Sequence, residues 1–294
     1  RRSMNSAFPQ LVDMKKIGIT VDGWFEWVVA NYGDALERAF LPVLRLLNGI
    51  EALLLWLPWY AIIAVIALTA WFVSRSLKLT LGCSFLIFLL GALGLWEAAM
   101  STIALMLTST IVAVLIGIPI GILLSRNDRT QAFTLPVLDI MQTMPIFVYL
   151  IPFVMLFGPG KIPALLATIV FAVPPVIRLT NLGIRQVDKE VVEAVTAFGA
   201  TPSQKLFSVQ IPLAMPTIMA GVNQTTMMAL SMVVIASMIG AGGLGGQVLQ
   251  GIQRLEVSRG FVAGMGIVFL AVVFDRIVQA QGRRLQQHLH SGQE

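Results

Sequence analysis

One stretch of the chain has the residue spacing of a phosphate-binding loop. Residues 240–245 read Gly-Ala-Gly-Gly-Leu-Gly and fit the pattern G-x-G-x-x-G. A dinucleotide site also needs a preceding strand, a following helix and a ribose-binding acid, whereas this stretch follows a long apolar run. We therefore expect a flexible loop here. Because the chain contains no G-x-x-x-x-G-K-[ST] motif, it cannot bind ATP by that route either.

Metal and thiol chemistry have few candidate residues. Cys83 is the only cysteine, so no disulfide within the chain and no cysteine metal site can form. It lies in an apolar run, which predicts a small packing residue. His288 and His290 lie in the polar C-terminal tail without a third ligand, which indicates a solvated tail. We expect no metal site, no bound cofactor and no catalytic residue in this chain.

Polar and charged side chains inside apolar runs are the next candidates, because such residues need partners in a membrane. Asp139, Arg178 and Asp275 lie at or just inside the ends of apolar runs. We favour structural ion pairing or snorkelling for them, and direct substrate contact stays open. The run 223–226 (Asn-Gln-Thr-Thr) lies near the middle of an apolar segment. It predicts either the lining of a wet pathway or hydrogen bonds between helices.

Residues 183–212 are unlike any other part of the chain. They form about thirty residues of charged, amphipathic sequence in an otherwise apolar protein. Gly199 ends one predicted helix, and Thr201-Pro202 starts the next as N-cap and first helical residue. Ordinary connecting loops are shorter and less periodic. The pattern predicts a helix–turn–helix that docks in a groove on a cytoplasmic partner, with an ordinary solvated loop as the alternative.

At this loop the sequence resembles the "EAA" coupling loop of ATP-binding-cassette importer permeases. Glu193-Ala194 is followed by Gly199 six residues after the glutamate, then by the apolar and proline residues that end the motif. Val195 departs from the family, which most often has a second alanine there. The resemblance implies that the following residues contact an ATPase: Glu193, Ala194, Gly199, Ala200, Pro202 and Pro212.

The resemblance extends over roughly residues 96–281 and narrows to one subfamily. Residues 141–145, 171–181 and 231–240 are similar to the permeases of glycine betaine/proline importers, which carry quaternary-ammonium osmoprotectants. It implies a type I (MetI-like) permease fold, a homodimer, two copies of a cytoplasmic ABC ATPase that bind ATP and Mg, and a substrate-binding protein outside the bacterial inner membrane. It implies a transport subunit and not an enzyme.

Composition supports a membrane protein built from helices. The 294 residues are 57% hydrophobic and 12% charged, about half the charge of a soluble domain. The net charge of +5 is scattered between apolar runs, so we expect no nucleic-acid partner. Runs long enough to cross a bilayer occur at 56–74, 78–95, 99–124, 135–157, 161–180, 217–239 and 260–281. The fourth and fifth runs are rich in proline, which predicts kinked or broken helices inside the bundle.

The lysines and arginines predict the orientation of these seven spans. They gather after the first, third, fifth and seventh runs, at Arg75, Lys78, Arg126, Arg129, Arg178, Arg185, Lys189, Lys205, Arg283 and Arg284. By the positive-inside rule these places are cytoplasmic, which puts the N-terminus outside and the C-terminus inside. Residues 22–50 alternate apolar and charged residues at helical spacing and predict a helix in the membrane interface. A soluble helix packed on a partner is the alternative.

The expected fold is therefore an all-α, polytopic bundle divided into four parts. Residues 1–50 form a tail and the interfacial helix, 51–95 two accessory transmembrane helices, 96–284 the permease core, and 285–294 a C-terminal tail. Candidate pathway residues are neutral and polar or aromatic: Gln142, Thr143, Tyr149, Phe153, Asn223 and Gln224, with Phe147 and Phe171 as weaker ones. Neutral lining suits a betaine, a proline-like zwitterion or choline better than an anion, which would need arginines.

One alternative substrate and two other classes of function stay open beside this one. An importer permease for another small solute, such as an amino acid, would share the coupling loop. A secondary transporter would carry intramembrane acids and inverted repeats, and a membrane scaffold would have no use for a coupling loop. The sequence shows no repeat and places its acids at span edges.

Overall fold

The computed structural model describes residues 14–290, without the side chains of 14–17, 34 and 282–290. Residues 1–13, residues 291–294 of the predicted C-terminal tail 285–294, and the side chains of His288 and His290 lie outside the described part. The elements are α1 (Met14–Trp56), α2 (Trp59–Ser74), α3 (Leu77–Ala92), α4 (Trp96–Arg126), α5 (Asp128–Thr143), α6 (Ile146–Phe157), α7 (Lys161–Arg185), α8 (Lys189–Ala197), α9 (Pro202–Lys205), the π-helix η1 (Leu206–Gln210), α10 (Ile211–Ala236), the 3-10 helix η2 (Ser237–Ile239), α11 (Gly243–Gln253) and α12 (Val257–His290). Residues 14–290 contain no strand, which confirms the predicted all-α fold.

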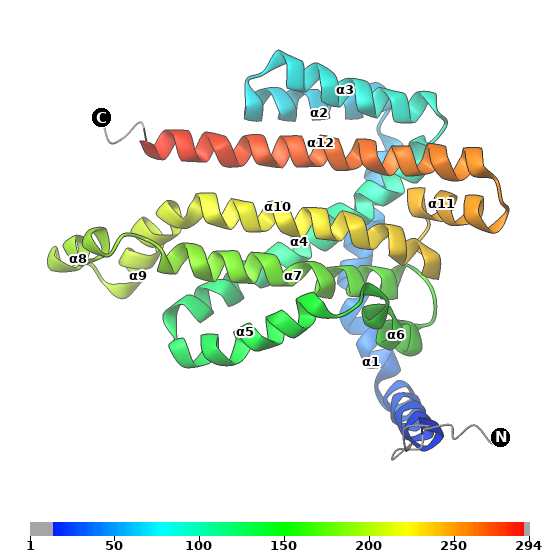
Figure 1. The fold of residues 1–294 in the computed structure, drawn as a ribbon, viewed down its shortest axis with the longest axis horizontal. Helices are drawn as coiled ribbons and strands as arrows, with labels where there is room; N and C mark the ends of the chain where they lie inside the picture. Colours follow the sequence, from blue (N-terminus) through cyan, green and yellow to red (C-terminus); the bar gives the residue numbers. More distant parts are fainter. Residues whose placement is uncertain (1–13, 291–294) are drawn as a thin grey trace, which may run out of the picture.

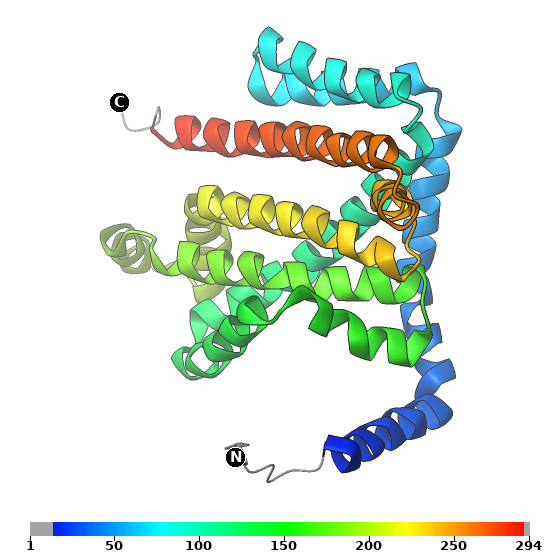
Figure 2. The ribbon, with the colours of Figure 1, turned by 45° about the vertical axis from the view of Figure 1, so that its right-hand side comes forward.

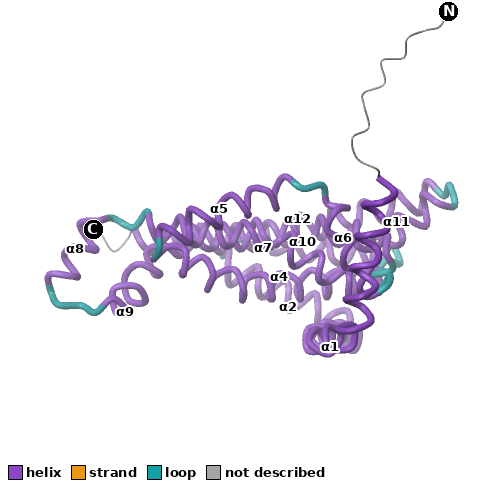
Figure 3. The backbone as a smooth tube through the Cα atoms, turned by 90° about the horizontal axis from the view of Figure 1, so that it is seen from below, coloured by secondary structure: helices purple, strands orange, loops and turns teal. Residues whose placement is uncertain are grey.

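The long helices run roughly parallel between two ends of the molecule. Figure 1 shows α12, α10 and α7 side by side, with the α2–α3 hairpin beyond α12 and α5 beyond α7. Helices α8 and α9 project at one end, here called the α8 end, and α11 lies at the other, the α11 end (Figures 1 and 2). The second half of helix α1 crosses the α11 end at a steep angle to the other long helices and is seen nearly end-on in Figure 3.

Glycines let α7 approach its two neighbours closely. A Cβ atom at Gly117 or Gly121 of α4 would lie 2.3 Å from Val176 Cγ1 or 2.8 Å from the Ile177 carbonyl oxygen of α7. A Cβ at Gly221 of α10 would lie 3.2 Å from Cα of Val176. Small residues at such interfaces allow the backbone contact that holds membrane helices together. Gly117 and Gly121 thus form a small-residue contact with α7, and α7 is the central helix of the bundle.

Helix α1 is longer than the predicted interfacial helix and includes a stretch long enough for a membrane span. Its second half is held on the bundle by Glu51, which pairs with Lys161 at 2.5 Å, and by Phe40, whose ring stacks edge-on with Phe157. Its first half exposes large aromatic side chains: Trp24, Trp27 and Tyr32. The predicted interfacial helix, residues 22–50, covers most of this exposed half and continues into the half that packs on the bundle.

Counting spans by helix length gives a different result from the predicted seven. Among the described residues, five helical segments are long and apolar enough to cross a membrane: Ala35–Trp56, Trp96–Arg126, Lys161–Arg185, Pro202–Ile239 and Val257–Gln281. The bent pair α5–α6 would make a sixth. The predicted spans at 56–74 and 78–95 are the 16-residue helices α2 and α3. At about 1.5 Å per residue such a helix covers about 24 Å, less than the roughly 30 Å of hydrocarbon.

The predicted span at 135–157 is broken, and the one at 161–180 is not. Helices α5 and α6 meet at an angle of 95°. Met144 is extended, as residues before proline tend to be, and Pro145 has no N–H to continue the helix. Helix α7 is continuous through Pro174 and Pro175 and is mostly buried, as predicted. Most residues of α5 are exposed in the single chain and α6 is only partly buried, so the predicted burial of the fourth span inside one bundle is wrong.

The glycine-rich stretch 240–245 is an ordered helix start and not a flexible loop. Gly240, Gly242 and Gly243 all have positive φ angles, and α11 begins at Gly243. The backbone N–H of Leu244 donates to the hydroxyl oxygen of Thr102 at 2.8 Å. This buried hydrogen bond fixes the stretch to α4, and no strand precedes it in the described part of the chain, so the dinucleotide pattern has no structural support.

Candidate functional site

Residues 188–212 form a helical hairpin, and local hydrogen bonds fix the start of each of its two helices, α8 and α9. Asp188 caps α8, accepting from the Glu190 N–H at 2.8 Å. Thr201 and Gln204 make a reciprocal capping box at the start of α9. Gly199 joins the two helices at φ +82°, a left-handed conformation that glycine adopts without strain. The helix–turn–helix predicted from these residues is confirmed.

The hairpin presents its side chains to the outside. No residue of α8 is buried, and Glu193 and Ala194 are both exposed. Two aromatic side chains that sequence reasoning missed stand out, Phe198 at 93% and Phe207 at 65% exposure. Large apolar groups exposed on a projecting element mark an interaction surface. The position of Phe198 directly before the glycine turn was the available sequence signal, and no such signal marked Phe207.

The remaining predicted coupling residues occupy the same hairpin. Ala200 is half-buried at the turn, and Pro202 is exposed as the first residue of α9. Pro212 is exposed in the first turn of α10. Buried Leu206 connects the hairpin to the bundle, packing with Ile184, Ala214 and Ile218. The structure therefore places all six predicted coupling residues between α8 and the start of α10.

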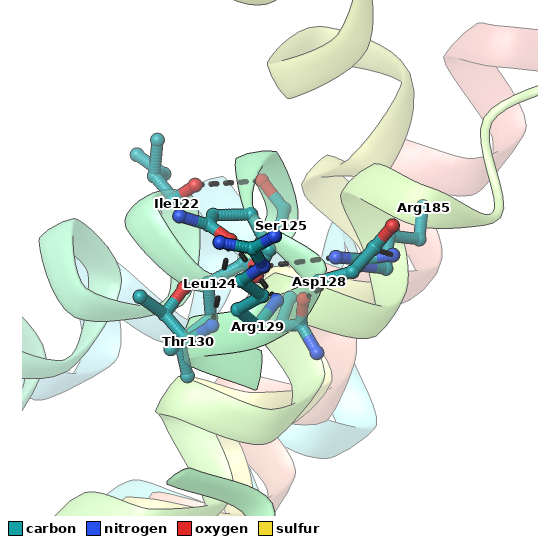
Figure 4. A network of polar contacts seen from close by, with 9 residues as sticks. Ile122, Leu124, Ser125, Asp128, Arg129, Thr130 and Arg185 are labelled. Carbon is teal, nitrogen blue, oxygen red and sulfur yellow. Dashed lines mark hydrogen bonds and ion pairs between the residues drawn. The ribbon is translucent and has the colours of Figure 1, made fainter. Parts of the chain in front are cut away.

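A network of polar contacts surrounds the root of the hairpin (Figure 4). The Arg185 guanidinium pairs with Asp128 at 2.7 Å, donates to the Leu124 carbonyl at 3.0 Å and donates to Asn181 Oδ1 at 3.1 Å. These contacts join the ends of α4, α5 and α7. Arg185 also lines a cavity of about 210 Å³ together with Glu193 of α8. Sequence reasoning used Arg185 only for orientation and missed this pairing.

The polar residues 223–226 of α10 differ in their contacts: some form hydrogen bonds to other groups of the protein, and others do not. The Thr225 hydroxyl donates to the Ala172 carbonyl of α7 at 2.8 Å and is buried, and Thr226 donates to Val222 within its own helix. Asn223 Oδ1 is buried without a hydrogen-bond partner among the described residues, whereas Gln224 is exposed. Interhelical bonding therefore accounts for Thr225, and Asn223 and Gln224 stay as pathway candidates.

The other pathway candidates lie at the break between α5 and α6. The Tyr149 hydroxyl donates to the Met141 carbonyl across the break, and its ring packs edge-on against Phe171 of α7 at 5.7 Å. Phe153 packs against the same cluster. Tyr149 and Phe171 are thus buried packing residues in the single chain. Gln142 is half-buried and Thr143 exposed at the end of α5.

Two of the three ionisable candidates are paired with each other. Arg178 of α7 and Asp139 of α5 form an ion pair, as the preference for structural pairing predicted. Asp275 instead accepts a hydrogen bond at 2.6 Å from Gln279, one turn further along α12. Among the described residues no group of three or more His, Cys, Asp and Glu side chains could hold a metal ion.

A larger cavity of about 1050 Å³ lies at the α11 end. It opens between α1, the start of α4, α11 and the start of α12, and its lining includes three carboxylates: Glu51, Glu97 and Glu256. Trp96 and Arg259 complete its polar and aromatic lining. The two ends of the molecule therefore differ, since one bears a projecting hairpin and the other a cavity.

Comparison with known proteins identifies the family. Residues 113–287, more than half of the chain, match the model of the binding-protein-dependent transport system inner membrane component. Among solved structures, the chain is similar to the methionine ABC transporter MetNI in inward-facing conformations. That likeness has a TM-score of 0.59 at 22% identity, covers 65% of this chain and 95% of the other, and shows the shared fold.

Curated relatives match over most of their length. The chain is 51% identical over 271 residues to the glycine betaine/proline betaine transport system permease protein ProW of Escherichia coli, covering 90% of this chain and 76% of the relative. It is 44% identical to the glycine betaine/carnitine transport permease protein GbuB of Listeria monocytogenes, covering 90% of this chain and 96% of that protein. It is 42% identical to the glycine betaine transport system permease protein OpuAB of Bacillus subtilis, covering 88% of this chain and 92% of that protein. The chain belongs to the family of binding-protein-dependent transport system inner membrane components, as a multi-pass permease subunit of an ABC importer.

Proposed function

We propose that this permease imports small solutes carrying a permanently charged quaternary-ammonium group, such as glycine betaine, proline betaine and choline. The single observation that carries the substrate class is the match to ProW, GbuB and OpuAB, whose names specify glycine betaine. A permanent cation cannot shed its charge, so crossing bare hydrocarbon is very costly. The neutral dipoles of Gln142, Thr143, Asn223 and Gln224 are suited to lining a wet path for such a solute.

The hairpin 188–212 is the docking element for the ATPase. It projects from the α8 end, buries no residue of α8 and exposes Phe198 and Phe207. Its caps hold it rigid before any partner binds, which lowers the entropic cost of docking into a groove. ATP and Mg are bound by that ATPase, because this chain has no phosphate-binding motif.

The working unit contains two copies of the chain. Cassette ATPases act in pairs, and each chain supplies one hairpin. The broken segment supports this arrangement, because α5 and α6 expose apolar side chains that one bundle does not cover: Phe133, Val137, Ile140, Phe147, Val148 and Ile151. A second copy packed there would enclose the Gln142–Thr143 end of α5.

The α8 end faces the cytoplasm and the α11 end faces outside. Basic residues gather toward the α8 end, which agrees with the positive-inside rule. The exposed half of α1, with Trp24 and Trp27, then lies along the outer interface, where tryptophan is favoured. The substrate-binding protein delivers the substrate at the α11 end, where the cavity of about 1050 Å³ opens.

Uptake by the complete complex tests the substrate class. Proteoliposomes containing the permease, its ATPase and its binding protein are supplied with labelled glycine betaine, choline, methionine or phosphate in parallel. We expect ATP-dependent uptake of at least one trimethylammonium compound and none of phosphate. Transport of methionine or phosphate without competition from either trimethylammonium compound would overturn the proposed substrate.

A further inference from the structure

Two ion pairs fasten α5 to α7 in antiparallel register. Asp128 pairs with Arg185, and Asp139 pairs with Arg178. At 3.6 residues per turn, the two aspartates are about three turns apart and the two arginines about two turns apart, so each couple shares one helix face. Leu138, next to Asp139, is the only buried side chain of α5 and packs on Leu124 and Ile177. Helix α5 is therefore held by an apolar cluster, to which Leu135 and Met141 also contribute, and by these two ion pairs.

Arg185 stands where this attachment meets the hairpin. It is the last residue of α7, and α8 begins at Lys189 after a short connection. Its guanidinium contacts α5 through Asp128 and α4 through the Leu124 carbonyl, as Figure 4 shows. The same side chain forms one wall of the 210 Å³ cavity, and Glu193 of α8 forms another. A displacement of α8 against the bundle would therefore change the cavity that this guanidinium lines.

The other end of α5 carries pathway candidates. Gln142 and Thr143 are its last two residues, and the Tyr149 hydroxyl binds the Met141 carbonyl across the break into α6. Helix α5 thus spans from the root of the hairpin to the break at Met144-Pro145. A helix held at both ends moves as one rigid element when one end is displaced.

We propose that Arg185 is a positioning residue that transmits movement of the coupling hairpin to the pathway end of α5. The inference rests on the proposed function, since it assumes an ATPase that moves α8. Its Asp128 partner is 89% exposed, and exposed ion pairs add little to stability. The pair is therefore poorly suited to holding the fold, and the positioning role rests on the contacts that Arg185 makes with α4, α5 and α7 together.

The test compares the amount of glycine betaine imported per ATP hydrolysed in proteoliposomes holding the complete complex. We expect Arg185→Gln and Asp128→Asn each to lower this ratio about tenfold, the scale of a typical coupling between sites. Arg185→Lys, which keeps the charge but loses the forked contacts, should give an intermediate ratio. Arg126→Gln is the matched control, because Arg126 is exposed near the same end and should keep the wild-type ratio.

A structural role alone would change the amount of assembled complex and leave the ratio intact, so size-exclusion chromatography is run on each variant. If Arg185→Gln does not assemble, Asp128→Asn carries the test. Wild-type ratios in assembled Arg185→Gln or Asp128→Asn complexes would overturn this inference while leaving the proposed function standing. Failure of the wild-type complex to import any trimethylammonium compound would instead overturn the proposed function.

Discussion

Glycine serves two different purposes in the bundle core and in the coupling hairpin. At Gly121 a Cβ atom would lie 2.6 Å from Thr180 Cβ, so glycine is needed for space between α4 and α7. At Gly199 nothing lies within 4 Å of a built Cβ, and glycine is needed for its φ of +82°. The core depends on close packing between helices, whereas the hairpin depends on local backbone geometry. Substitutions in the two regions should therefore fail in different ways.

The largest effect is expected in the core. Gly121→Ala forces α4 away from α7 and should lower the free energy of unfolding by about 1–3 kcal/mol, the range for overpacked interiors. Thermal unfolding of the purified permease in detergent measures this loss. Gly264→Ala is the matched control, because nothing lies within 4 Å of its built Cβ and alanine favours a helix by up to about 1 kcal/mol. Equal midpoints for the two variants would contradict the close packing.

A substitution at Gly199 of the hairpin should reduce stimulated ATP hydrolysis without unfolding the permease. Gly199→Val places a β-branched residue in a left-handed conformation that costs about 1–2 kcal/mol, so the turn between α8 and α9 should rearrange. We expect substrate-stimulated ATP hydrolysis to fall at least about tenfold with an unchanged unfolding midpoint, since the hairpin adds no buried α8 residue to the core. Gly199→Asn, which tolerates this conformation, should retain most activity. A lowered midpoint with normal hydrolysis would reverse the comparison.

The smallest effect is expected at the capping box. Thr201→Ala removes the side-chain acceptor for the Gln204 N–H and should destabilise the start of α9 by about 1 kcal/mol. Stimulated hydrolysis should fall by a few-fold, less than in Gly199→Val. Ser203→Ala, two residues further along in α9 and also exposed, is the control and should behave as wild type. A loss as large as that of Gly199→Val would show that the cap matters as much as the turn.

The difference between local backbone geometry and packing between helices also explains which features could be predicted from the sequence. The hairpin was predictable because its signals are local: Gly199 ends one helix and Thr201-Pro202 begins another. The seven apolar runs predicted a helical membrane bundle, but their lengths did not show that α2 and α3 end after 16 residues. Composition marked both proline-rich spans as kinked or broken, yet neighbours on both sides keep α7 continuous through Pro174 and Pro175.

Contacts between distant segments could not be predicted from the sequence. The pairing of Arg185 with Asp128 and Leu124 depends on how α4, α5 and α7 pack together. The order of the glycine-rich stretch at α11 depends on the Thr102 hydroxyl, which lies far away in the chain. The burial of Tyr149 follows from its contacts with Met141 and Phe171. Each is a tertiary effect that residue type and spacing do not encode locally.

Photo-cross-linking tests the central claim most directly, namely that the exposed tip of the hairpin contacts the ATPase. A photoreactive amino acid replaces Phe198 at the α8 end or, as the matched control, Phe261 of α12 near the α11 end, which is 68% exposed. In membranes containing the complete complex, we predict a cross-link to the ATPase from position 198 and none from position 261. A cross-link to the ATPase from 261 and not from 198 would contradict both the coupling role of the hairpin and the proposed orientation.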